Sequence, residues 1–231
     1  MQKIIECVPN FSEGRRKKIV EEIIAEIESV EAVKLLDYEM DADHNRAVVT
    51  FIGGPEAVSE AAFLAISKAS ELIDMEVHKG GHPRIGAADV VPFIPIKNIT
   101  TEECVELASE LGKKVGFELE IPVYLYEDAA RTESRRNLAD VRAGQYEGLK
   151  EAISADPARK PDFGPAKMHP RAGAVAIGVR MPLIAYNVNL DTDNLDLAKS
   201  IAKQIRYKVG GFKYVKAMGL ALKDRGIVQV S

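Results

Sequence analysis

The stretch KIIECVPNFSEGRRKKIVEEIIAEI, residues Lys3 to Ile27, sets the pattern on which the fold is built. Its first part, Lys3 to Pro9, is rich in β-branched residues and ends in a proline, which indicates a short strand. After a polar loop, in which Ser12 is a candidate helix cap, apolar residues recur at helical spacing from Ile19 to Ile27. The chain therefore begins with a strand followed by an amphipathic helix.

The elements that follow this pair are not in regular alternation. We expect strands at Val33–Asp37 and Ala47–Ile52, and then a helix over Pro55–Ile73. A later strand, Asp89–Ile94, contains Pro92, and because proline removes a ladder donor we expect this strand to lie at an edge or to end there. The order lacks the strict βαβ repetition of doubly wound folds, so it predicts an α+β fold with mixed sheets.

The segment Ser154–Pro170 breaks the pattern with four prolines and leaves two interpretations open. It could be a linker, since proline-rich linkers are stiff spacers. Phe163 and Met168 are apolar residues that a pure linker does not need, so a rigid wall over a site is an equal alternative. Beyond this segment, Gly173–Val179 and Leu183–Asn189 are expected to form a strand pair, followed by a helix and further strands.

Composition and charge narrow the class of protein. The 231 residues carry 31 Lys and Arg against 35 Asp and Glu, a formal net charge of −4, and 46% are hydrophobic. This globular balance gives no electrostatic reason to expect a nucleic acid partner. No apolar run is long enough to span a bilayer, so no membrane association is expected. The chain starts without the apolar region of a signal peptide, and its two cysteines make no disulfide framework, so we expect a cytoplasmic protein.

Histidine is scarce, and two of the four copies lie in the run HKGGHPRIGAAD, residues His78 to Asp89. A zinc site on one helix face is disfavoured, because the two glycines and the proline of this run oppose a helix and no cysteine is near in sequence. General acid–base catalysis by a histidine of near-neutral pKa is one interpretation that stays open. The other is a polar surface loop whose glycines only turn the chain.

Under the catalytic interpretation, each neighbour in this run has a role. Gly80 and Gly81 let the backbone approach a ligand closely. Lys79 and Arg84 supply positive charge for a carboxylate substrate, and Asp89 orients a histidine or pairs with Arg84.

A second polar cluster, Asp41 to Arg46, favours a turn satisfied by its own Asp and Asn side chains over a cation site, since the calcium-loop spacing fails after Asp43. The chain lacks the glycine-rich nucleotide motifs and the G-x-S-x-G elbow, so nucleotide chemistry and serine hydrolysis are poorly supported. Cys7 is expected to be a buried, inert strand residue.

A set of runs spans nearly the whole chain in order: Cys7–Arg15, Asp43–Arg46 with Thr50–Gly53, His78–Pro95, Tyr124–Glu127, Pro161–Pro165, Ala185–Leu190, Val215–Gly219 and Gln229–Ser231. Together they resemble the glutamate formimidoyltransferase (formiminotransferase) family, which occurs alone in bacteria and fused to a cyclodeaminase in animals.

The resemblance implies a cytoplasmic enzyme of histidine degradation that moves the formimino group from N-formimino-L-glutamate to N5 of the co-substrate tetrahydrofolate, with no metal. It implies two α+β subdomains, residues 1–172 and 173–231, whose mixed sheets face each other with helices outside and folate in the cleft between them. A homodimer is expected. His82 would be the general acid/base, taking a proton from N5 and giving one to the departing glutamate nitrogen.

The same likeness assigns the folate site to two stretches: Phe163, Gly164, Pro165, Ala166, Lys167, Met168, His169, Pro170 and Arg171, and then Tyr214, Val215, Lys216, Ala217, Met218, Gly219 and Leu220. Because both substrates are carboxylates, Arg46, Lys79 and Arg84 are candidate anchors.

One feature departs from the family's pattern, because family members usually continue well past the Gln-Val-Ser run that ends here at Ser231. We therefore expect a truncated second subdomain with an uncovered sheet edge, which invites self-association. The alternatives left open are a related transferase that uses a formyl donor, a non-catalytic folate- or partner-binding module, a truncated enzyme of weak activity, and a purely structural domain.

Overall fold

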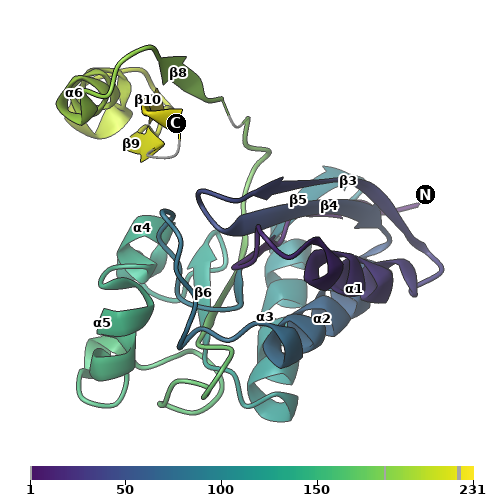
Figure 1. Ribbon diagram of the computed structural model, residues 1–231. Coiled ribbons are helices and arrows are strands. Elements are labelled where there is room, and N and C mark those ends of the chain that lie inside the picture. Colours follow the sequence, from purple (N-terminus) through teal and green to yellow (C-terminus); the bar gives the residue numbers. More distant parts are fainter. Residues whose placement is uncertain (1, 185, 223–224) are drawn as a thin grey trace. The chain divides into compact units, whose positions relative to one another are not determined.

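The computed structural model describes residues 2–184, 186–222 and 225–231, and the chain divides into two compact units at the Met181–Pro182 bond (Figure 1). Sheets and helices occur in both units in the irregular order that the sequence predicted, so the α+β class is confirmed. Among the described helices, none combines the length and the apolar character that a membrane span requires.

The first unit is built on a seven-stranded mixed sheet. Its strands are β1 (Ile4–Cys7), β2 (Asn10–Phe11), β3 (Val33–Asp41), β4 (Arg46–Gly53), β5 (Ala88–Lys97), β6 (Val123–Glu127) and β7 (Val175–Val179). β1 and β2 share one place in the sheet, because each pairs with both β4 and β5. β3 flanks β4 on the outside, while β7 and β6 continue the sheet beyond β5 as its parallel part.

Three long helices pack against this sheet: α1 (Lys17–Glu28), α2 (Pro55–Leu72) and α3 (Thr101–Glu118). α2 packs against both α1 and α3, and the three lie side by side in Figure 1. α1 buries Val20, Ile23, Ile24 and Ile27, the face that its sequence period predicted. Each such burial stabilises the fold by roughly 1.5–3 kcal/mol. Between β6 and β7 the chain forms α4 (Leu138–Val141), α5 (Gln145–Ala152) and the 3₁₀ turns η1 (Glu133–Arg135) and η2 (Pro157–Arg159).

The prediction that Pro92 marks an edge strand is wrong. β5 is a central strand, paired with β1 and β2 on one side and with β7 on the other. Pro92 lies opposite the break between β1 and β2, where the Val8 N–H donates to the Pro92 carbonyl at 3.3 Å. The N–H and the C=O of a strand residue point to the same neighbouring strand. The N–H that Pro92 lacks would therefore face the gap between β1 and β2, where the hydrogen-bond ladder is already interrupted.

The expected strand pair of Gly173–Val179 and Leu183–Asn189 is also wrong. Residues Val175–Val179 form β7, which inserts between β5 and β6 in the first sheet and runs parallel to both. All five residues of β7 are buried, and a continuous apolar run of this kind suits a parallel strand covered on both faces. In the other expected strand, Ala185 lies outside the described residues.

The proline-rich segment Ser154–Pro170 is packed onto the first unit and is not a free linker. Phe163 forms a β-bridge with Val123, and the Val123 N–H donates to the Phe163 carbonyl at 3.0 Å. Gly164 has a positive φ of 79°, and a Cβ there would lie 2.6 Å from the Ile121 carbonyl. Glycine is therefore required where this segment passes close to the sheet.

The second unit contains a three-stranded antiparallel sheet in the order β8 (Val188–Leu190), β10 (Ile227–Val230), β9 (Gly219–Leu222). Helix α6 (Leu195–Ile205) is followed by the 3₁₀ turn η3 (Tyr207–Val209). Ala198 and Ala202 of α6 pack against Val228 and Val230 of β10 and form a small separate core. Asn194 caps α6 by accepting from the Leu197 N–H at 3.1 Å.

Candidate functional site

Two connections of the first unit build the candidate site: the turn between β3 and β4, and the run from His78 to Asp89 between α2 and β5. The Gly81 N–H donates to the Asp43 carbonyl at 3.2 Å. A Cβ on Gly80 would lie 2.2 Å from the His44 carbonyl oxygen, so only glycine fits there. The two glycines thus bring the backbone close to the turn between β3 and β4. The sequence had led us to expect a close approach to a ligand at these glycines.

His78 holds these two connections together. Its Nε2 lies 3.0 Å from the Asn45 carbonyl, which can only accept, so Nε2 carries the proton. Its Nδ1 then accepts from Nε of Arg84 at 3.3 Å. Burial lowers the pKa of His78 and keeps the ring neutral. Because both ring nitrogens are hydrogen-bonded within the protein, His78 has a structural role.

Arg84, a predicted carboxylate anchor, is engaged by a carboxylate of the protein itself. Its two terminal nitrogens bond the two carboxylate oxygens of Glu147 at 2.9 and 2.7 Å. This hydrogen bonding lowers the pKa of Glu147 to about 2. The Tyr146 N–H also donates to the Arg84 carbonyl at 2.9 Å, so α5 is docked against the histidine run.

Asp89 is the centre of a buried charge cluster. Its Oδ2 accepts from Nη1 of Arg46 at 2.7 Å and also from Nη2 of Arg142, while its Oδ1 accepts from the Ile85 N–H at 2.8 Å. Burial by itself would raise the pKa of Asp89, but the two guanidinium groups hold it below its ordinary value. Asp89 therefore pairs with Arg46 and Arg142, and the expected pairing with Arg84 is not formed.

His82 lies close to this cluster with one ring nitrogen fixed. Its Nδ1 donates to the Pro83 carbonyl at 2.7 Å, which leaves Nε2 as the unprotonated nitrogen. Burial, and then the charges of Arg46 and Arg142, lower the pKa of His82 to about 3. The expectation of a near-neutral pKa is therefore wrong for this structure: His82 is a neutral imidazole whose Nε2 has no hydrogen-bond partner among the described residues.

A second histidine stands beside His82. The His44 ring meets the His82 ring edge-on, with 5.9 Å between the centroids. Asp41 accepts from the His44 backbone N–H at 2.8 Å and lies 3.1 Å from its Nδ1, which confirms the turn that was favoured for this cluster. Within residues 2–184, 186–222 and 225–231, no group of three or more His, Cys, Asp or Glu side chains is arranged to hold a metal ion.

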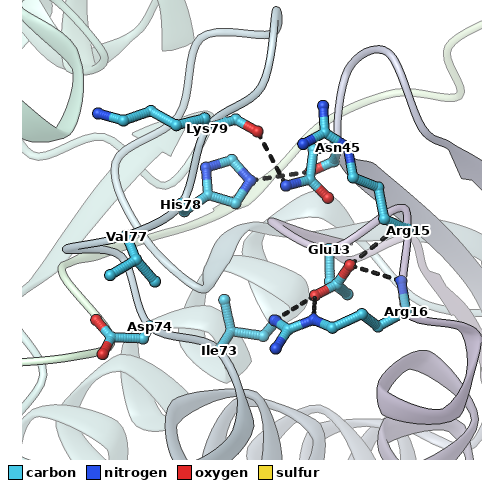
Figure 2. Close-up of a pocket in the computed structure, with 9 residues that line it drawn as sticks. All are labelled: Glu13, Arg15, Arg16, Asn45, Ile73, Asp74, Val77, His78 and Lys79. Carbon is cyan, nitrogen blue, oxygen red and sulfur yellow. Dashed lines mark hydrogen bonds and ion pairs between the residues drawn. The ribbon is translucent and has the colours of Figure 1, made fainter.

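His78 and Asn45 also line a pocket of about 330 Å³ (Figure 2). Glu13 lines this pocket and accepts from the backbone N–H groups of Arg15 and Arg16, both at 2.9 Å. Glu13 thus holds the start of α1, a role expected of Ser12, whose hydroxyl donates instead to the Gly86 carbonyl. The exposed side chain of Lys79, another predicted anchor, lines the same pocket.

The two stretches predicted to bind folate belong to different units. In Phe163–Arg171, the Phe163 ring lies under the guanidinium of Arg131 at 4.4 Å, and Nδ1 of His169 accepts from the Ala172 N–H at 2.9 Å. In Tyr214–Leu220, the Tyr214 side chain is 87% exposed. A folate site shared by the two units remains a prediction.

Three residues of the cluster were not singled out from the sequence: Arg142, Glu147 and Asn10, the last of which accepts from Nε of Arg46 at 3.0 Å. Arg142 and Glu147 lie in a segment whose charges look like an ordinary solvated helix surface. Their partners are 53 and 63 residues away, so no local spacing could have identified them.

The sequence of the chain is similar to a known family and to several known proteins. A family model described as the formiminotransferase domain, N-terminal subdomain, matches residues 4–180. A glutamate formimidoyltransferase of Streptococcus pyogenes serotype M1 is 52% identical over 231 residues, which are 100% of this chain and 77% of that protein. One of Thermoplasma acidophilum is 52% identical over 230 residues, 99% of this chain and 75% of that protein. The formimidoyltransferase-cyclodeaminase of Gallus gallus is 47% identical over 237 residues, 100% of this chain and 43% of that protein.

Proposed function

This chain belongs to the formiminotransferase family, and on that premise we propose that it transfers the formimino group of N-formimino-L-glutamate to N5 of tetrahydrofolate. The observation that carries the proposal is His82, whose Nδ1 proton is held by the Pro83 carbonyl and whose Nε2 is left as a base. Histidine degradation in the cytoplasm is the proposed setting, and a homodimer remains a prediction.

The proposed reaction needs one proton to be moved twice. N5 attacks the formimino carbon, and Nε2 of His82 accepts the proton that N5 loses. The resulting imidazolium returns this proton to the glutamate nitrogen, the bond from that nitrogen to carbon breaks, and 5-formimino-tetrahydrofolate and L-glutamate form. A positioned acid/base of this kind contributes ~10²–10⁴-fold in rate.

The surrounding charges fit a base that is neutral before reaction. Because the pKa of His82 is about 3, protonating its ring at pH 7 costs about 5 kcal/mol in this structure. A negative charge that arrives with the substrate would reduce this cost.

The test is a turnover assay of the purified chain with formiminoglutamate and tetrahydrofolate, in which glutamate release is measured. The matched variant is His82→Asn, because an Asn amide can still donate to the Pro83 carbonyl but cannot accept a proton as a base. We expect kcat to fall at least ~10²-fold at an unchanged melting temperature. A variant with nearly full kcat would refute the role of His82.

The same assay separates the alternatives that the sequence left open. Release that requires a formyl donor in place of the formimino donor would indicate the related formyl transferase. Tetrahydrofolate binding without turnover of either donor would indicate a folate-binding module.

A further inference from the structure

We propose that Arg142, together with Arg46, binds a carboxylate of the glutamate-derived donor and holds that donor beside His82. This inference rests on the proposed function and adds to it a residue that the sequence pattern did not reveal. The segment between α4 and α5 thereby becomes part of the substrate site.

The charges of the buried cluster do not balance. Arg46 and Arg142 share one oxygen of a single carboxylate, Asp89, and the other oxygen of Asp89 is used by the Ile85 N–H. The side chains of Arg46 and Arg142 are 8% and 12% exposed. Within these contacts of the described residues, two positive charges thus face one negative charge away from water, and a second carboxylate would restore the balance.

Arg142 also has an unused donor. Its Nε is buried and, among the described residues, has no hydrogen-bond partner. A buried polar group without a partner is rare in a folded protein and calls for an explanation. Arginine can bind a carboxylate through two parallel hydrogen bonds, one from its Nε–H and one from the adjacent terminal nitrogen. We call this pair of donors the side-on edge.

Three carboxylates of neighbouring segments are paired with other partners. Glu147 is bonded to Arg84 through both of its oxygens. Glu13 is paired with Arg16, and Asp41 is paired with His44. The balancing anion therefore has to come from outside this set, and the glutamate moiety of the donor carries such carboxylates.

The place of the cluster links this binding to catalysis. The described charged and titratable groups around His82 include Arg46 on β4, Arg142 after α4, Asp89 on β5 and His44 in the β3–β4 turn. Arg46 and Arg142 both oppose protonation of the His82 ring. A carboxylate bound between them offsets this field, so the donor raises the proton affinity of the base that acts on it.

The experiment measures L-glutamate binding by calorimetry, the His82 ring signal by NMR, and the KM for formiminoglutamate. The variants are Arg142→Gln, the charge-keeping Arg142→Lys, and Arg136→Gln as the matched control. Arg136 is 58% exposed and pairs with the surface residue Glu133, so that variant should behave as wild type.

We expect Arg142→Gln to weaken glutamate binding and raise the KM by ~30-fold or more, the range found when one partner of a buried charge pair is removed. Saturating glutamate should raise the pKa of His82 in the wild type and leave it unchanged in Arg142→Gln. Arg142→Lys should keep part of this response but lose at least ~10-fold in affinity, because lysine has no side-on edge.

Unchanged glutamate affinity and an unchanged His82 response in Arg142→Gln would overturn the inference. If that variant does not fold, Arg142→Lys decides, since wild-type affinity there would have the same meaning. A wild-type chain that binds glutamate through Arg142 but does not turn over with tetrahydrofolate would refute the proposed function alone. Turnover with a KM that is insensitive to Arg142 would refute this inference alone.

Discussion

Replacing Asp89 by Asn tests whether the buried cluster holds the first unit together. Asp89 is fully buried and serves two arginines and one backbone N–H, and Asn has nearly the same shape without the charge. Removing one partner of a buried ion pair while its arginines stay costs about 3–5 kcal/mol. For a unit of this size, 1 kcal/mol moves the melting temperature by roughly 2–4 °C. The expected fall for Asp89→Asn is therefore roughly 6–20 °C at pH 7.

The assay is thermal unfolding followed by circular dichroism across pH, with Glu133→Gln as the matched control. Glu133 is 90% exposed and loses the same charge, so its melting temperature should change little. The pKa of Asp89 is depressed in the folded state, so its stabilisation is complete above the unfolded value of about 4 and is lost as the pH falls through the lower folded value. The gap between wild type and Asp89→Asn should thus be constant from pH 7 to 5 and narrow below about pH 4.

A fall of less than about 3 °C at pH 7 would refute this account of the cluster, because it would put the contribution of the Asp89 carboxylate at about 1 kcal/mol or less. A gap that stays constant far below pH 4 would also contradict it, because the unfolded wild-type chain then gains a proton on Asp89 that the folded carboxylate resists, and this reduces the stabilisation.

Three further predictions follow from the same geometry. Gly80→Ala forces a Cβ to within 2.2 Å of the His44 carbonyl oxygen and should destabilise the first unit by about 1–3 kcal/mol. The control Gly148→Ala, with open space around its Cβ, should not destabilise it. Equal melting temperatures for the two variants would show that the close contact at Gly80 does not matter for stability. Arg84→Met should lower the melting temperature but change the KM for formiminoglutamate by less than ~3-fold, because Arg84 is already bonded within the protein; a large KM effect in steady-state kinetics would restore Arg84 as an anchor. In NMR titrations without substrate, the His82 ring should stay neutral down to about pH 4, because its pKa is about 3; a midpoint near 6.5 would contradict the effect of burial and of the arginines.

Much of the fold follows from local pattern. The helical period of Ile19–Ile27 predicted α1, and Pro55 marked the first residue of α2. The errors arose where a residue acts through its neighbours in space. Pro92 is compatible with a central strand only because β1 and β2 break opposite it, and β7 joins the first sheet because two parallel partners enclose it.

The candidate site divides in the same way. The run His78–Asp89 drew attention by itself, since scarce histidines beside glycines and charges form a pattern along the chain. The partners of that run lie 43 to 63 residues away in sequence, as in the pairs Arg46 with Asp89 and Arg84 with Glu147.

The sequence by itself therefore determined the α+β class, the main helices and the family, because period, order of elements and motif are properties of neighbours along the chain. Only the tertiary structure decided which charges surround His82. Burial and the field of Arg46 and Arg142 exist only once β4, β5 and the α4–α5 segment have come together. These long-range contacts lower the proton affinity of the ring and set two buried arginines against the single carboxylate of Asp89, the arrangement on which the proposed donor site rests.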